Sequence, residues 1–324
     1  MYNFILYIFM SKQIVIVGAG ISGMSTAFLL AGQGHHITIC ATAFSPHITS
    51  NRAAAFWFPY HIRNDKRGIE WCNTSYSYYK DFAREAATGI SMRQLKKVLR
   101  KGVVEEEPVW IEFMPEGSYS ILKGAALEEG IETIYNVTVP LIETQLFLPW
   151  LQQQLVEKGV EFKTVFIDDL DALTKDYDLV INCSALGAGK LCNDTTVTPV
   201  RGQVVLLEPI PDMTIYLDNE KLLYVVPRKD AIIVGGTYEV GVATEVADPS
   251  TLERLLYNAC EALPELKKQA VIGSWAGVRP YRPEVRVENE ANKNIIHNYG
   301  HGGSGFTLAF GCAETVCKLV ETIA

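Results

Sequence analysis

Near the start of the chain, the pattern of apolar positions predicts a strand, a helix and a second strand in succession. Residues 14–17 are all apolar, as expected for a strand that a parallel sheet buries on both faces. An apolar stripe at helical spacing follows over residues 24–30, and Gly34 is well placed to end that helix. Residues 37–41 predict the second strand. The pattern therefore predicts a βαβ unit.

The next part of the chain mixes helical and strand patterns. Residues 67–87 carry apolar side chains at helical spacing, which predicts an amphipathic helix. Strands are expected around 109–114 and 131–142. A further helix is predicted from Pro149 to Lys158, with Gly159 as its end.

Five later apolar runs predict more strands. The runs at 160–166 and 179–182 suit strands that return to the sheet of the βαβ unit. The runs at 204–207, 224–226 and 232–234 look like antiparallel strands.

Two helices are predicted in the last quarter of the chain. Ser250-Thr251-Leu252-Glu253 forms a capping box for a helix that ends near Pro264. The final helix places apolar side chains on one face: Phe306, Phe310, Ala313, Val316 and Val320.

These elements predict an α/β protein in which a Rossmann-like domain is interleaved with a mixed or antiparallel-sheet domain. The first, discontinuous domain is expected to comprise residues 11–65, 145–205 and 270–324. The second is expected to comprise residues 66–144 and 206–269, and residues 1–10 belong to neither.

Composition narrows the class of protein. The 324 residues carry a formal net charge of −8, with 48% hydrophobic and 20% charged residues, as in a soluble globular protein. The negative charge argues against a nucleic-acid surface, which would need a basic patch. A basic run at 96–101 is followed by glutamates at 105–107, and this stretch is predicted to be a solvated loop of mixed charge.

The first ten residues and the cysteines bear on location. Residues 1–10 are too few to span a bilayer, and they lack a basic segment or a cleavage site. We expect translation to begin at Met10, with a weak membrane anchor as the alternative. The seven cysteines are scattered without a Cys-x-x-Cys pair, so no metal site is expected. Their odd number favours a reducing, cytoplasmic location.

Gly18-Ala19-Gly20-Ile21-Ser22-Gly23 follows the first strand and opens the first helix. This G-x-G-x-x-G spacing is typical of a dinucleotide site, where glycines allow a tight turn and a close approach to pyrophosphate at a helix N-terminus. Thr42 stands near the end of the second strand, where a ribose-binding carboxylate is usual. Its hydroxyl is the candidate replacement, and the missing carboxylate argues against NAD.

A second glycine-dense loop lies near the C-terminus. Residues 295–305 run from a hydrophobic strand through His301-Gly302-Gly303-Ser304-Gly305 into the last helix. Two strand, loop and helix units at opposite ends of the chain suggest one cofactor held between them.

From residue 295 to Ala313 the chain resembles the signature of the D-amino-acid oxidase family of FAD enzymes. Other segments follow that family's order along nearly the whole chain after Met10: residues 52–60, 182–189, 201–203, 224–228, 235–238 and Gly277-Val278-Arg279-Pro280. The resemblance implies an FAD-dependent enzyme.

The resemblance also implies a substrate site. Arg279 matches the arginine that binds the substrate carboxylate, a task that suits a guanidinium fork, and Tyr224 matches the tyrosine that assists it. Tyr216 is the candidate tyrosine of a long lid, Phe58 a pocket wall, and Ser304 a further substrate contact. Purely structural roles for Arg279 and Tyr224 remain the alternatives.

A larger set of residues is implied for the cofactor. His301 is expected to contact FAD through its backbone, with a role as catalytic base as the alternative. The implied cofactor residues are Gly18, Ala19, Gly20, Ile21, Ser22, Gly23, Thr42, Thr49, Ser50, Ala54, Ala55, Phe56, Val165, Ser184, Arg279, His301, Gly302, Gly303, Ser304, Gly305, Phe306 and Thr307.

The implied reaction is hydride transfer from the substrate Cα to flavin N5, without an acid–base side chain. O₂ then takes the electrons, and a keto acid, ammonia and hydrogen peroxide result. Phe58 favours neutral D-amino acids, whereas Lys221 or Arg228 are candidates for binding an acidic side chain, and Asp218 or Glu220 for a basic one. D-aspartate oxidase activity, glycine-oxidase-like activity and a non-catalytic flavin sensor remain alternatives, and a homodimer stays open.

Overall fold

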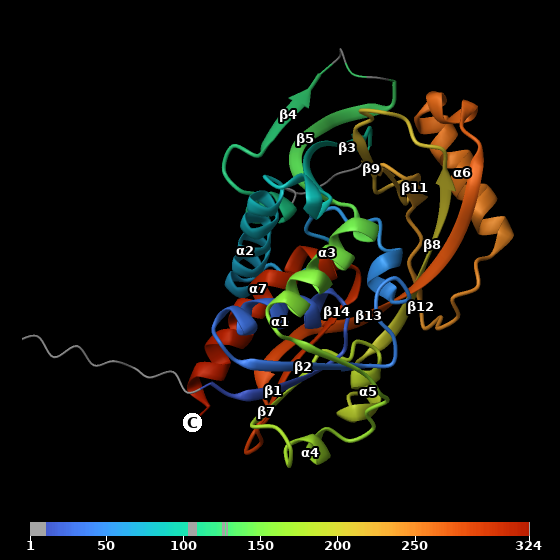
Figure 1. The fold of residues 1–324 in the computed structure, drawn as a ribbon. Coiled ribbons are helices and arrows are strands. Elements are labelled where there is room, and N and C mark those ends of the chain that lie inside the picture. The colour runs from blue at the N-terminus through green and yellow to red at the C-terminus, as the bar shows by residue number, and fades with distance from the viewer. Residues whose placement is uncertain (1–10, 103–108, 125–126, 128, 324) are drawn as a thin grey trace, which may run out of the picture.

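The computed structural model describes residues 11–102, 109–124, 127 and 129–323. The predicted N-terminal extension (1–10) and the acidic run (105–107) lie outside the described residues. One sheet of fourteen strands organises the described chain, in the order β4-β5-β3-β9-β10-β11-β8-β13-β14-β7-β1-β2-β6, and β12 pairs with β8 beside this path. Figure 1 shows the sheet running through the molecule with helices packed along it. The predicted α/β fold is confirmed.

One end of the sheet is parallel. It contains β1 (Gln13–Val17), β2 (His36–Ala41), β6 (Glu161–Thr164), β7 (Leu179–Asn182) and β14 (Ile295–His301). All the pairings among these strands are parallel. The apolar runs that predicted β1 and β7 are buried, because helices and loops cover both faces there.

The other end of the sheet is mainly antiparallel. Its strands are β3 (Ile90–Arg100), β4 (Tyr119–Lys123), β5 (Ile131–Ile142), β8 (Thr198–Leu207), β9 (Ile215–Asp218), β10 (Leu223–Pro227), β11 (Ile232–Gly235) and the short β12 (Glu239–Val240). Only the pair β3 and β9 among these described strands is parallel.

Strand β13 (Val271–Asn289) connects the two ends of the sheet. Its first part pairs with β8 as far as Tyr281, and from Tyr281 onward it pairs with β14. The sheet is therefore hydrogen-bonded across the predicted domain boundaries, and the domain division itself stays a prediction.

Four helices pack together beside the parallel strands (Figure 1): α1 (Ile21–Gly32), α2 (Lys66–Phe82), α3 (Thr144–Glu157) and α7 (Gly305–Thr322). Helix α6 (Pro249–Ala262) covers β8, β10 and β11, while the short α4 (Leu170–Leu173) and α5 (Gly187–Leu191) lie near β7. The 3₁₀ turns are η1 (Thr49–Arg52), η2 (Ala86–Thr88), η3 (Val109–Phe113), η4 (Pro264–Lys268) and η5 (Gly302–Ser304).

The prediction of a solvated loop at 96–101 was wrong. Residues 96–100 belong to β3, and the Lys97 side chain is buried against two aromatic rings. Its Nζ lies 5.5 Å from the centre of Trp110 and 5.3 Å from the centre of Tyr135. Aromatic faces attract a cation in this geometry, so the charge did not keep the strand in solvent.

Three further element predictions need correction. The stretch at 109–114 forms the 3₁₀ turn η3 instead of a strand. The helix predicted over residues 67–87 is α2, which ends at Phe82. Helix α6 begins after Asp248, whose carboxylate accepts a hydrogen bond from Thr251 N at 2.9 Å. Asp248 takes the cap from the predicted Ser250 because Pro249, which lacks an N–H, fits the first helical position.

Candidate functional site

The two glycine-rich loops meet where helices α1 and α7 begin. Gly18 has a φ of 115°, and a Cβ there would lie 2.2 Å from the Cys183 carbonyl oxygen. A Cβ on Gly23 would lie 2.0 Å from the Gly18 oxygen, so α1 packs directly against its own loop. A Cβ on Gly305, at the start of α7, would lie 3.5 Å from Ile21 Cγ2 at the start of α1. The helix N-termini therefore adjoin one another.

A cavity of about 720 Å³ opens between these loops and the antiparallel strands. Most of the site residues predicted from the sequence line it: Gly18, Gly20, Ile21, Ser22, Thr42, Thr49, Ser50, Ala54, Ala55, Phe56, Phe58, Ser184, Tyr224, Arg279, His301, Gly302, Gly303, Gly305, Phe306 and Thr307. A cavity of this size that is bordered by a Gly-rich helix N-terminus suits a dinucleotide.

Besides Tyr216, four of the predicted residues do not line the cavity. Ala19 and Gly23 are part of the first glycine loop and pack inward. Val165 follows β6, half-exposed, and donates its backbone N–H to a neighbouring strand at 2.9 Å. Ser304 is buried, and its hydroxyl donates to the Tyr60 carbonyl oxygen. Ser304 does not line the cavity, and its predicted contact with the substrate stays a prediction.

Tyr216 lies on the wrong face of its strand for a lid. Leu217 lines the cavity, and because side chains alternate along a strand, Tyr216 points to the opposite face. Its hydroxyl is 3.4 Å from a carboxylate oxygen of Asp218 within a separate buried cluster. The residues predicted to form a long lid lie on β9 and in the turn to β10, which is closed by a hydrogen bond from Leu222 N to Asn219 O at 3.1 Å.

Arg279 and Tyr224 come together in the cavity wall. Arg279 lies on β13, and its Nη1 donates to the Thr237 carbonyl at 3.0 Å. A Cβ on Gly202, on the neighbouring strand β8, would lie 2.3 Å from Nη2 of Arg279. A Cβ on Gly235, directly paired with Tyr224, would lie 2.4 Å from the Tyr224 hydroxyl. Two glycines therefore make the space that these side chains occupy.

The Arg279 charge acts on the Tyr224 phenol. Burial raises the pKa of the Tyr224 phenol, and the charge and hydrogen bond of Arg279 oppose that rise. The phenol therefore remains a neutral hydroxyl beside a permanent cation at ordinary pH. A guanidinium and a hydroxyl facing one cavity are suited to binding a carboxylate.

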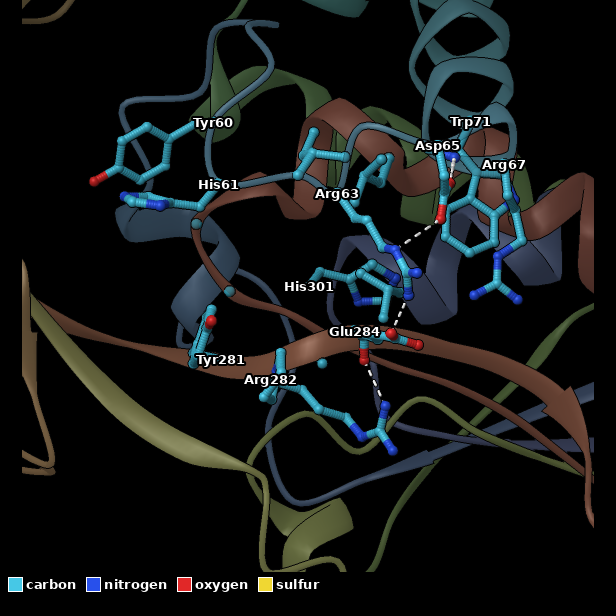
Figure 2. A pocket seen from close by; sticks show the side chains of 18 of the residues that line it. Tyr60, His61, Arg63, Asp65, Arg67, Trp71, Tyr281, Arg282, Glu284 and His301 are labelled. Atoms are coloured by element: carbon cyan, nitrogen blue, oxygen red, sulfur yellow. Dashed lines mark hydrogen bonds and ion pairs between the residues drawn. The ribbon is translucent and has the colours of Figure 1, made fainter. Parts of the chain in front are cut away.

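An aromatic group beside Arg279 was missed from the sequence. The rings of Tyr60 and His61 are 4.3 Å apart, and His61 lies 5.0 Å from the ring of Tyr238. Figure 2 shows Tyr60 and His61 side by side at one end of a smaller pocket that shares His301 with the main cavity. Burial and the Arg279 charge lower the pKa of His61, so the imidazole is neutral at pH 7. Tyr60 and Tyr238 end the segments 52–60 and 235–238 that carry the resemblance, whereas nothing in the sequence marked His61.

The candidate charged residues for side-chain recognition lie elsewhere. None of Lys221, Arg228, Asp218 and Glu220 lines the cavity. Arg228 is buried and donates to Asp230 at 2.9 and 2.6 Å.

Asp218 is also committed to another partner. It accepts two hydrogen bonds from Arg100, at 2.9 and 2.6 Å. These carboxylate and guanidinium groups are therefore engaged in structural ion pairs away from the site.

Comparisons with known proteins agree with this geometry, which is that of a flavin-dependent oxidoreductase. The family model of FAD-dependent oxidoreductases of the D-amino-acid oxidase type matches residues 13–319. The chain is 33% identical to a D-amino-acid oxidase of Rubrobacter xylanophilus, with 94% of each chain covered. It is 31% identical to one of Streptomyces coelicolor, covering 95% of this chain and 97% of the relative.

The fold is also similar to the crystal structure of glycine oxidase from Geobacillus kaustophilus. The TM-score is 0.81 at 18% identity, over 97% of this chain and 95% of the other. The chain belongs to the D-amino-acid oxidase family of FAD-dependent oxidoreductases. It is an enzyme, and its cofactor is FAD, as the sequence predicted.

The residues that face the cavity fit FAD. Asn298 Oδ1 and His301 Nε2 are buried without a hydrogen-bond partner among the described residues, and both residues line the cavity. Burial lowers the pKa of His301 to about 4, which leaves a neutral imidazole. Buried polar atoms normally have partners, and the polar edge of a flavin or its ribityl chain would supply them.

Two further surveys concern the described residues alone. No helix among them combines the length and apolar composition that crossing a membrane requires. The same part of the chain has no group of three or more His, Cys, Asp or Glu side chains that could hold a metal ion.

Proposed function

We propose that this protein oxidises neutral D-amino acids with FAD and O₂, producing an imino acid and hydrogen peroxide. The imino acid then hydrolyses to a keto acid and ammonia. The observation that carries this proposal is the Arg279 guanidinium beside the Tyr224 hydroxyl in the wall of the FAD cavity. The names of the relatives from R. xylanophilus and S. coelicolor support amino-acid oxidation and the D configuration.

In this proposal the protein acts mainly by orientation. The Arg279 fork binds the substrate carboxylate, and the Tyr224 hydroxyl donates a further hydrogen bond to it. FAD bound in the cavity would supply the acceptor for a hydride from the substrate Cα. Because the Cα hydrogen leaves as a hydride, assisted by the lone pair of the neutral amine, no side chain has to remove a proton from Cα.

His301 has a different role from that of a catalytic base. Its imidazole is buried, and a pKa of about 4 makes it a very weak base. Its position at the start of η5, beside Gly302 and Gly303, supports a contact to the cofactor.

The cavity walls favour a neutral substrate side chain. Phe56, Phe58, Leu217 and Leu222 contribute apolar surface. Apart from Arg279, the Lys, Arg, Asp and Glu side chains that line the cavity in the described part of the chain are Arg52 and Glu245, which form an ion pair with each other. An acidic substrate side chain therefore has no uncommitted cation to bind.

The first test is anaerobic mixing of the FAD-loaded protein with D-alanine and, separately, with L-alanine. We expect D-alanine alone to bleach the flavin absorbance, because only one enantiomer can present its Cα–H while its carboxylate is bound. Equal bleaching by L-alanine would refute the stereochemistry, and no bleaching by either would refute the reaction.

A substrate panel tests the side-chain preference. We expect kcat/KM for D-alanine and D-methionine to exceed that for D-aspartate and glycine by at least about tenfold, the effect of roughly 1.4 kcal/mol in transition-state binding. A panel led by D-aspartate or glycine would overturn the preference while leaving the FAD chemistry in place.

A further inference from the structure

A cysteine, a histidine and a glutamate form a hydrogen-bonded series outside the cavity. Cys192 follows α5, His297 lies on β14, and Glu290 lies in the turn between β13 and β14. Cys192 Sγ is 3.8 Å from His297 Nδ1, and His297 Nε2 is 3.0 Å from Glu290 Oε2. Cys192 is partly exposed as a residue, whereas the His297 side chain is fully buried. The three side chains have the order of nucleophile, base and orienting carboxylate.

The protonation state of the histidine follows from its neighbours. Partial burial disfavours the charged form of Glu290, but hydrogen bonds from Lys293 and His297 outweigh it and lower the pKa of the carboxyl. An ionised Glu290 accepts, so Nε2 of His297 must donate. Nδ1, which faces Cys192 and also lies 3.4 Å from Asn182 Nδ2, is then the unprotonated nitrogen that accepts.

The imidazole can accept the thiol proton at Nδ1, although burial makes it a weaker base than a free histidine. Burial and the Arg286 charge lower the pKa of His297, although Glu290 opposes them, so the ring is neutral at pH 7. Burial raises the pKa of the Cys192 thiol, against hydrogen bonding by Tyr299 and the charge of Arg286. A thiol with a raised pKa needs a local base in order to react.

Asn182 also stabilises the sulfur. Its Nδ2 donates to Cys192 Sγ at 3.1 Å, and the same amide accepts two hydrogen bonds from Ser184, which lines the FAD cavity. A donor aimed at the sulfur favours negative charge there.

We propose that Cys192 is a peroxide-reactive site, at which hydrogen peroxide oxidises the thiol to a sulfenic acid with His297 as the base. The thiol proton moves to His297 Nδ1, and the sulfur attacks one peroxide oxygen. The S–O bond forms as the O–O bond breaks, and the departing hydroxide takes the proton back from His297 to give water. The sulfur is oxidised by two electrons and the peroxide is reduced. The peroxide source rests on the proposed function, since that reaction makes hydrogen peroxide.

The other cysteines provide controls. Cys40, Cys72, Cys183, Cys312 and Cys317 are buried. Cys260 is half-buried like Cys192, and burial raises the pKa of its thiol too, but its charged neighbours are Lys267 and Glu261 instead of an imidazole. The pair Cys192 and Cys260 therefore separates exposure from the effect of His297.

The test adds hydrogen peroxide to the FAD-loaded protein without substrate, traps sulfenic acid with dimedone, and quantifies each cysteine by mass spectrometry. We expect Cys192 to be trapped at least about tenfold faster than Cys260, a threshold set below the roughly hundredfold at which general-base contributions typically begin. Equal rates at the two cysteines would overturn the proposal.

Two variants test the role of the base. His297→Asn should slow the trapping of Cys192 by about tenfold or more and leave Cys260 unchanged. Glu290→Gln changes a more exposed side chain and should slow it several-fold, with folding checked by circular dichroism. Wild-type trapping in a folded Glu290→Gln protein, or in a folded His297→Asn protein, would refute the relay.

A last arm replaces added peroxide by D-alanine and O₂. Trapping of Cys192 during turnover, abolished by catalase, would support the site and the reaction together. Trapping with added peroxide but none with D-alanine would support the thiol site and count against the proposed reaction.

Discussion

Substituting Gly202 by alanine tests the proposed binding of the substrate carboxylate by Arg279 and Tyr224 without changing either of these two residues. The new Cβ would lie 2.3 Å from Nη2, 2.5 Å from Cζ and 2.6 Å from Nη1 of Arg279. Atoms of this kind pack at about 3.5 Å or more, so the guanidinium must move by roughly 1 Å. The clash is with the mobile end of a long side chain, so the backbone of β8 and β13 can stay in place.

The expected effect is on catalysis and not on folding. A misplacement of about 1 Å in a substrate-positioning group can reduce the rate by about a hundredfold. We therefore expect Gly202→Ala to lower kcat/KM for D-alanine by about 10- to 100-fold, or roughly 1.4 to 2.7 kcal/mol. The free energy of unfolding should change by less than about 1 kcal/mol, since alanine also restricts the unfolded chain.

Oxygen consumption with D-alanine, together with urea unfolding, measures both quantities. Gly273→Ala is the matched control, because it lies on β13 and its Cβ would meet only Leu206 Cδ1 at 4.0 Å. That variant should retain the wild-type kcat/KM. A Gly202→Ala protein with kcat/KM within twofold of the wild type would refute the assignment of Arg279. A large loss of stability instead would refute the view that its guanidinium can move freely.

Four other changes have expected outcomes. Arg279→Lys should lower kcat/KM in steady-state assays by about a hundredfold, because an ammonium cannot bind a carboxylate with two parallel hydrogen bonds. Tyr224→Phe should raise KM for D-alanine several-fold, by about 1 kcal/mol, with an unchanged melting temperature. Gly236→Ala should lower the free energy of unfolding by more than about 2 kcal/mol, since its φ is 146° and a Cβ would lie 1.6 Å from the Leu222 carbonyl oxygen. In the absence of flavin, His301 should lower the free energy of unfolding by about 3 kcal/mol as the pH drops from 6.5 to about 4, because its side chain binds a proton in the unfolded chain at a higher pH than in the folded protein. Urea unfolding at several pH values measures this loss, which His301→Gln should not show.

Local patterns predicted the parts of the fold in which burial and sequence agree. The apolar runs of β1 and β7 and the two glycine loops were predictable because a buried parallel strand and a phosphate-type turn tolerate few residue types. A shared cofactor site between the two loops was predicted from the family resemblance as well as from these patterns, because the sequence of one loop does not show that the other loop lies beside it.

The misses have a common physical origin in distant contacts. Lys97 gave β3 a polar appearance, yet Trp110 and Tyr135 cover it. Tyr216 could be placed on a strand but not on a face, because one residue of register decides whether it or Leu217 meets the cavity. His61 reaches the site through the fold around it, and no spacing in the sequence marks it.

Strand β13 places Arg279 close in sequence to a residue that pairs with the cofactor loop. Arg279 sits only two positions before Tyr281, whose register partner is His301 at the edge of the cofactor loop. The pairings of β13 with β8 and β14 thus connect Arg279 to the cofactor loop through one strand, whose register with β14 shifts between Tyr281 and Arg286. Changes in substrate preference should therefore be tolerated in the loops around the cavity. Insertions or deletions within β13 should abolish activity, because they would shift Arg279 relative to the cofactor loop.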